Sequence, residues 1–110
     1  MAPFLLLLLL SGAPKPLALS VNPQVGRTPL VVHIQPRVAQ DDTYRLLVLQ
    51  SYCGAEEYPD NEKVVQTGYP IPMVTWTLRC SEQSVIHGFV VDQAGKKVKG
   101  SIVDVTVLTY

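Results

Sequence analysis

The sequence predicts an all-β chain in which two antiparallel sheets of about seven strands in total pack as a sandwich. Short β-branched segments alternate with Pro- or Gly-containing turns about every eight to twelve residues after residue 16. Several segments alternate apolar and polar residues, as half-buried strands do. No window of about eleven residues keeps a helical apolar repeat without an interrupting proline or β-branched alternation. We therefore expect no helix after the N-terminal segment.

The N-terminal segment is typical of an export leader. Six consecutive leucines occupy residues 5–10, and Pro14 and Pro16 follow soon afterwards. This apolar stretch is about half of the roughly 20 residues that a membrane-spanning helix needs. We therefore expect a signal-peptide-like leader and short linker over residues 1–16, a domain over residues 17–110, and no stable transmembrane segment in the mature chain. A buried N-terminal strand or helix is the alternative.

The first three expected strands lie at residues 17–21, 30–34 and 44–53. The first alternates apolar residues with small or polar ones and ends where Asn22-Pro23 breaks the pattern. In the second, Leu30, Val32 and Ile34 share one face. The third is apolar on both parities, which predicts a strand in the centre of a sheet.

Four further strands are expected at residues 62–66, 73–80, 85–91 and 101–108. The first of these is short and is predicted to lie at a sheet edge. In the next, Val74, Trp76, Leu78 and Cys80 share a parity, so we expect them to face the core. The last two flank a polar turn with Gly95, and the lysines at positions 96, 97 and 99 belong to that turn. Together they predict a terminal hairpin.

The two cysteines, Cys53 and Cys80, each lie at the end of an expected strand with core-facing parity. An even number of cysteines in an exported chain indicates a disulfide. Closing this loop would stabilise the fold by roughly 3 kcal/mol in the chain-entropy model. Two buried free thiols are the alternative.

Charge and side-chain spacing narrow the range of functions. Nine basic residues balance nine acidic ones and are scattered, so nucleic acid is not an expected partner. His33 and His87 lack the spacing of metal ligands, and we expect neither a metal nor another cofactor. Ser84 and His87 fall on opposite faces of a strand, so they form no catalytic pair. We therefore expect no enzyme.

The connection between residues 54 and 72 holds the candidate binding residues. Its carboxylates could form a weak calcium site within residues 54–62, although a solvated loop is the simpler interpretation. Tyr52, Tyr58 and Tyr69 could form an aromatic and acidic patch for sugars or proteins, or they could pack the loop onto the sandwich. The candidate binding residues are Glu56, Glu57, Tyr58, Asp60, Asn61 and Tyr69.

Both ends of the expected domain resemble bacterial and archaeal PKD-type and related immunoglobulin-like modules. The resemblance rests on Leu19-Ser20-Val21-Asn22-Pro23, Gly26 and Thr28-Pro29-Leu30-Val31-Val32 at one end. At the other end it rests on residues 89–95 and 103–107. Between them, Tyr52-Cys53-Gly54-Ala55-Glu56-Glu57 replaces the aromatic-Asp-Phe-Gly-Asp-Gly motif of PKD modules. The resemblance implies an immunoglobulin-like β-sandwich and a spacer, adhesion or protein-binding role.

These observations together predict an exported, non-catalytic module that is secreted, periplasmic or at the cell surface. Its expected partner is a protein or a larger assembly in which exposed sheet edges take part. A carbohydrate-binding domain that uses the loop tyrosines is the alternative. A line of exposed aromatic side chains would favour carbohydrate, whereas buried tyrosines with open edge strands would favour protein.

Overall fold

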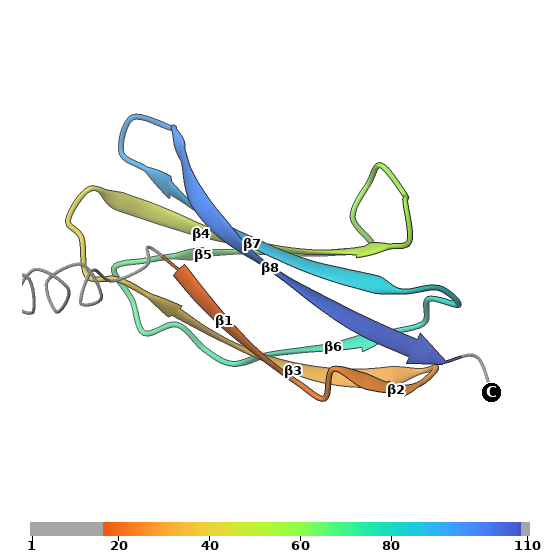
Figure 1. The fold of residues 1–110 in the computed structure, drawn as a ribbon. Coiled ribbons are helices and arrows are strands. Elements are labelled where there is room, and N and C mark those ends of the chain that lie inside the picture. Colours follow the sequence, from red (N-terminus) through yellow and green to blue (C-terminus); the bar gives the residue numbers. More distant parts are fainter. Residues whose placement is uncertain (1–16, 109–110) are drawn as a thin grey trace, which may run out of the picture.

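The computed structural model describes residues 17–108, which fold as the predicted immunoglobulin-like β-sandwich and contain no helix in that range (Figure 1). The predicted leader, residues 1–16, lies outside the described residues. One sheet has three strands in the order β1 (Leu17–Asn22), β3 (Leu30–Val38) and β6 (Val74–Leu78). The other has five, in the order β2 (Val25–Arg27), β8 (Lys97–Leu108), β7 (Ser84–Asp92), β4 (Tyr44–Cys53) and β5 (Asn61–Gln66).

The core lies between the two sheets and consists of the side chains that alternate inward along each strand. In β3, Leu30, Val32 and Ile34 are buried while Val31 and His33 are exposed, as their parity predicts. The fully buried side chains of the opposite sheet come mainly from its middle strands. They are Leu47, Leu49, Ser51, Ser84, Ile86, Val90 and Val105.

Strand β4 occupies the interior of the five-stranded sheet, which confirms its predicted central position. It pairs antiparallel with β7 on one side and with β5 on the other. Strand β5 pairs with β4 alone, so it is the edge strand that the sequence predicts. Among residues 17–108, no strand pairs with its outer edge, which leaves backbone groups there without a strand partner.

The structure contains one strand more than the seven that the sequence predicts, and the additional strand is β2. It has three residues and pairs parallel with β8, where Thr106 N donates to Gln24 O at 2.8 Å and Thr28 N to Leu108 O at 2.7 Å. Three residues between Pro23 and Pro29 are too few to show an alternating pattern. The pairing therefore follows from the tertiary arrangement rather than from a local signal.

The predicted terminal hairpin is confirmed, but its second strand begins earlier than expected. Strand β8 starts at Lys97, so Lys97 and Lys99 belong to the strand rather than to the turn. The pairing with β7 shifts between Gly88 and Val90, which marks a bulge. Gly100 lies against the backbone of Gly88, where a Cβ would collide. A bulge hides the alternation on which a strand prediction depends.

The predicted disulfide between Cys53 and Cys80 is present, with the two Cα atoms 5.5 Å apart. Cys53 ends β4 of the five-stranded sheet, and Cys80 follows β6 of the three-stranded sheet, so the bond joins the two sheets. A disulfide of this kind indicates an oxidising, extracytoplasmic compartment. Within residues 17–108 we find no helix of the length and apolar character needed to span a membrane.

Candidate functional site

The loop that joins β4 to β5, residues 54–60, carries most of the predicted binding residues and is fixed to the sandwich by its backbone. Gly54 adopts a positive φ of 56° and donates its N–H to Gln83 O at 2.8 Å. At the other end of the loop, Asp60 N donates to Ser51 O at 2.7 Å. Figure 1 shows the loop rising on the side of the five-stranded sheet that faces away from the three-stranded sheet.

The structure brings only part of the predicted site together. Glu56, Asp60 and Asn61 line a shallow groove beside the disulfide, the disulfide groove, together with Arg79. Within this set, the Asn61 side chain donates Nδ2–H to the buried Ser51 Oγ at 2.9 Å. Asn61 therefore also fastens the edge strand β5 to β4.

The remaining predicted residues do not line that groove. Glu57 and Tyr58 are exposed on the loop, Tyr58 with 75% of its side chain accessible. Tyr69 is 66% exposed but follows the far end of β5. The loop that carries Tyr58 precedes β5 and the connection that carries Tyr69 follows it, and Figure 1 shows these two segments at opposite ends of the sandwich. These two tyrosines therefore do not form one aromatic patch.

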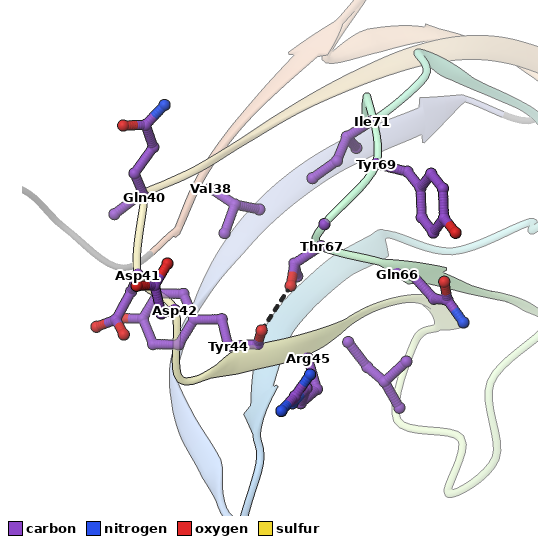
Figure 2. A pocket seen from close by; sticks show the side chains of 13 residues that line it. Val38, Gln40, Asp41, Asp42, Tyr44, Arg45, Gln66, Thr67, Tyr69 and Ile71 are labelled. Carbon is purple, nitrogen blue, oxygen red and sulfur yellow. Dashed lines mark hydrogen bonds between the residues drawn. The ribbon is translucent and has the colours of Figure 1, made fainter.

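A larger groove, the end groove, lies at the end of the sandwich where Tyr69 is found (Figure 2). Its volume is about 1040 Å³, and it lies between the β3–β4 turn and the β5–β6 connection. Val38, Tyr44 and Ile71 are half-buried, and each also packs against the core. Figure 2 shows Asp41 and Asp42 on one side of the groove and Tyr69 on the other.

Hydrogen bonds fix both walls of the end groove. Thr67 Oγ1 donates to Tyr44 O at 2.9 Å, and Thr67 N donates to Arg45 O at 3.0 Å. On the opposite wall, the side chain and the backbone N–H of Thr43 both donate to Asp41 Oδ1, at 2.6 and 2.8 Å. These two bonds lower the pKa of the Asp41 carboxyl, because they stabilise its ionised form. The groove is therefore preformed and has an anionic side.

Sequence reasoning missed the end groove, although the pairing of the strands contains a signal for it. In an antiparallel pair, the residues after one strand lie beside the residues before its partner. The Leu46↔Gln66 register places residues 67–71 next to residues 39–44. A prediction of the β4–β5 pairing would thus have moved Tyr69 away from Glu56 and toward Asp41.

The third surface is the outer face of the five-stranded sheet, which faces away from the other sheet. Strands β4, β5, β7 and β8 contribute apolar side chains to it in neighbouring rows, as the Val64↔Val48 and Val48↔Phe89 pairings show. Val64 and Ile102 are 51% and 65% exposed, whereas neighbouring side chains cover Val48 and Phe89. The apolar members of this outer face are Leu46, Val48, Tyr52, Val64, Val85, Phe89, Val91 and Ile102.

Polar side chains are embedded in this outer face. Tyr52 donates its hydroxyl to Gln50 Oε1 at 2.9 Å, and Gln50 Nε2 donates to Glu62 Oε2 at 2.9 Å. Lys97 Nζ lies 4.7 Å from the centre of the Phe89 ring, and the His87 ring centre is 5.5 Å from that of Phe89. Burial, and secondarily the charge of Lys97, lowers the pKa of His87. Its surroundings therefore favour the neutral form of the imidazole.

The residues required for hydrolytic or metal chemistry do not converge in the described part of the chain. Ser84 faces the core and is buried, whereas His87 lies on the outer face, as the spacing on the strand predicts. His33 bonds Thr75 Oγ1 across the β3–β6 pair, with its Nδ1 at 3.1 Å. Among residues 17–108, no three His, Cys, Asp or Glu side chains are close enough to hold a metal ion.

Comparison with known proteins adds a structural likeness. No protein-family model and no curated protein matches the sequence. A solved structure of similar fold is superoxide reductase (neelaredoxin) from Ignicoccus hospitalis, with a TM-score of 0.61 and 14% sequence identity. The alignment covers 84% of this chain and 80% of that one. At this identity the likeness concerns the β-sandwich fold alone.

Proposed function

We propose that this chain is an exported, non-catalytic immunoglobulin-like module that binds a partner protein, in adhesion or as a structural spacer of a larger assembly. The observation that carries the proposal is the apolar outer face of the five-stranded sheet. In an antiparallel sandwich the side of a sheet away from the core normally carries polar residues. Here it carries neighbouring apolar side chains on four strands. Val64 and Ile102 of this face are exposed, whereas Val48 and Phe89 between them are covered by neighbouring side chains. Exposed apolar side chains above such an apolar layer favour a contact site.

Two neighbouring features support a protein partner for this face. The β4–β5 loop, with Glu56, Glu57 and Tyr58, rises on the same side of the sheet and would border the contact (Figure 1). Within the described residues, β5, the strand of Val64, is unpaired along its outer edge, where an extended segment of a partner could pair. An apolar centre with an aromatic and polar margin is the usual anatomy of a protein interface.

The carbohydrate alternative has less support from the geometry. Flat sugar-binding surfaces would need several exposed aromatic rings in a line, but Tyr58 and Tyr69 lie at opposite ends of the domain and Tyr52 is half-buried. The disulfide between Cys53 and Cys80 and the leader-like residues 1–16 support a secreted, periplasmic or surface location. The resemblance of both ends of the domain sequence to PKD-type modules supports a relationship with PKD-like surface modules.

Site-specific photocrosslinking in cells that make the full chain tests the proposal. A photoreactive phenylalanine analogue replaces Ile102 on the outer face or, as a matched control, Val31, which is 45% exposed on the other sheet. We expect a discrete crosslinked protein from position 102 and none from position 31. Equal crosslinking from both positions, or none from position 102 and its neighbour 64, would refute a contact through this face.

A further inference from the structure

We propose that the domain also associates with a second copy of itself, end to end, with Lys96 of each copy entering the end groove of the other. This surface differs from the outer face of the sheet, so the inference goes beyond the proposed function and does not depend on it. It follows from the chemistry of the groove, from the position of the β7–β8 turn, and from the symmetry that these two neighbouring features allow.

The end groove is lined by two carboxylates and one cation, Arg45, whose Nη2 donates to Gln93 Oε1 of the β7–β8 turn at 3.5 Å. The charge of the lining is therefore net negative, which favours a long cationic side chain. The half-buried apolar residues of the groove, Val38, Tyr44 and Ile71, can receive the methylene stem of a lysine. The carboxylates of Asp41 and Asp42 lie on one side, and the exposed ring of Tyr69 lies on the other (Figure 2). A carboxylate and an aromatic face are both favourable neighbours for an ammonium group.

The β7–β8 turn presents a lysine at the same end of the domain. Asp92 Oδ1 accepts N–H bonds from Ala94 at 3.0 Å and from Lys96 at 2.9 Å, and Gly95 has a positive φ of 80°. Residues 93–95 form the tip of this tight turn, and the exposed Lys96 follows them, where its carbonyl accepts the Asp92 N–H at 3.0 Å. Lys97, by contrast, is engaged over the Phe89 ring. Lys96 is therefore the side chain that the turn offers to another molecule.

The turn and the groove are adjacent in one molecule. Gln93 N donates to Thr43 O at 2.7 Å, which ties the start of the turn to the groove wall that carries Asp41 and Asp42. Figure 1 shows the β3–β4, β5–β6 and β7–β8 connections at one end of the sandwich. A two-fold axis that runs between the turn and the groove, in the plane of contact, places each turn against the partner's groove. Such an isologous contact is self-complementary and closes at two copies.

The charges at this end match that arrangement. Asp42 on the groove wall and Lys96 on the turn have opposite sign, and the two-fold axis would form the Asp42–Lys96 pair twice. Both side chains are exposed in the separate molecules, so salt would weaken the two pairs. Reversing one of these charges therefore removes two contacts per dimer.

Sedimentation equilibrium of the protein purified from cells expressing the full chain tests the inference. We expect a monomer–dimer equilibrium that weakens as salt is raised. Lys96→Glu and Asp42→Lys should each raise the dissociation constant by about tenfold or more. The double variant should recover much of the lost affinity, because it exchanges the two charges. Thermal melting of each variant shows whether it is folded.

Two control variants locate the contact. Arg79→Glu lies beside the disulfide groove at the opposite end, and Ile102→Lys lies on the outer face, so both should dimerise as the parent does. A monomer at every concentration, or a dimer indifferent to Lys96→Glu and Asp42→Lys, would overturn the inference. A dimer broken by Ile102→Lys alone would also overturn it and would assign self-association to the sheet face. The crosslinking experiment at position 102 judges the proposed function separately.

Discussion

The two sheets of this sandwich resemble each other on the sides that meet and differ on the sides that face outward. The outer side of the three-stranded sheet follows the usual alternation, with one exposed large apolar residue, Val31, on its described strands. Its other outward residues are small, polar or charged: Ala18, Ser20, Asn22, His33, Gln35, Arg37, Thr75 and Thr77. The outer face of the five-stranded sheet carries valine, leucine, isoleucine and phenylalanine in neighbouring rows.

This difference distinguishes two explanations for a strand that is apolar on both faces: a central position in the sheet, and contact with another molecule. A central position explains why β4 and β7 have neighbours on both edges, but the outward side of a central strand in a sandwich still meets solvent. Neighbouring side chains cover Val48, but centrality alone does not account for the half-buried Val85 and Val91. The proposed contact with another molecule would account for them, and the contrast between the sheets can be tested by substitution.

The largest effect is expected inside the sandwich. Leu47 is fully buried and Leu46, its neighbour on β4, is half-buried on the outer face. Leu47→Ala should lower the free energy of unfolding by about 3–4 kcal/mol, because it leaves a cavity between the sheets. Leu46→Ala should lower it by less than about 1 kcal/mol. Urea unfolding of the two variants measures the difference, and equal losses would mean that the outer face is part of the core.

The bond between the sheets should contribute nearly as much. Replacing Cys53 and Cys80 together by serine should lower the free energy of unfolding by about 3 kcal/mol, because the unfolded chain regains the entropy of a 27-residue loop. Parent protein unfolded in the presence of a reductant is the matched comparison and should lose a similar amount. A loss below about 1 kcal/mol would show that packing of the core between the sheets holds them together without the disulfide.

The fold could be predicted from the sequence because its signals are local and repeated. Strict alternation identified β1, β3 and β6, and the polar turn with Gly95 identified the hairpin of β7 and β8. Strand parity placed both cysteines on core faces, so the disulfide followed. Strand β2 and the first residues of β8 escaped prediction, because a three-residue strand and a bulge both lack a regular period.

The candidate site was less predictable because its parts meet only through sheet pairing. Tyr58 and Tyr69 are close in sequence, yet the antiparallel course of β5 carries them to opposite ends of the domain. Asp41 and Tyr69 are far apart in sequence and line the same groove. Residues 44–53 are apolar at both parities, which is a sequence signal for the outer face. Because a central strand also explains this pattern, an apolar outer face was not predicted from the sequence.

The exposed β4–β5 loop should matter for binding much more than for stability. Replacing Glu56, Glu57 and Tyr58 together by alanine should change the free energy of unfolding by less than about 1 kcal/mol, because all three side chains are exposed. The same variant should weaken capture of the protein that crosslinks to position 102. Unfolding of the triple variant, or undiminished capture, would show that the loop does not border the contact.

Matched surface substitutions sharpen the contrast between the two outward sides. Val64→Lys, Ile102→Lys and Val31→Lys replace residues of comparable exposure, and each should change the free energy of unfolding by less than about 0.5 kcal/mol. Retention on a hydrophobic-interaction column should fall more for positions 64 and 102, which lie near further apolar side chains of the outer face, than for position 31. Equal decreases at all three positions would remove the distinction between the faces.

The smallest expected effect is a pH dependence of the free energy of unfolding, caused by His87 on the outer face. Burial beside Phe89, and then the charge of Lys97, lowers the pKa of His87 in the folded protein. The unfolded chain, with an ordinary histidine pKa near about 6.5, therefore takes up a proton before the folded protein does. The free energy of unfolding should consequently decrease as pH falls below about 6.5, and this decrease should level off below the folded pKa.

His87→Gln should reduce the slope of unfolding free energy against pH between about pH 7.5 and 5.5, whereas His33→Gln on the other sheet serves as the control variant. Asp41 acts in a separate range, because its lowered pKa favours the folded protein above the ordinary carboxyl pKa and that contribution is lost only as pH falls through the lower folded value. Chemical unfolding at closely spaced pH values distinguishes the two ranges. If His87→Gln left the slope unchanged while His33→Gln reduced it, the pH response would belong to the polar outer side of the three-stranded sheet. The outer face would then not provide His87 with a partly desolvated environment.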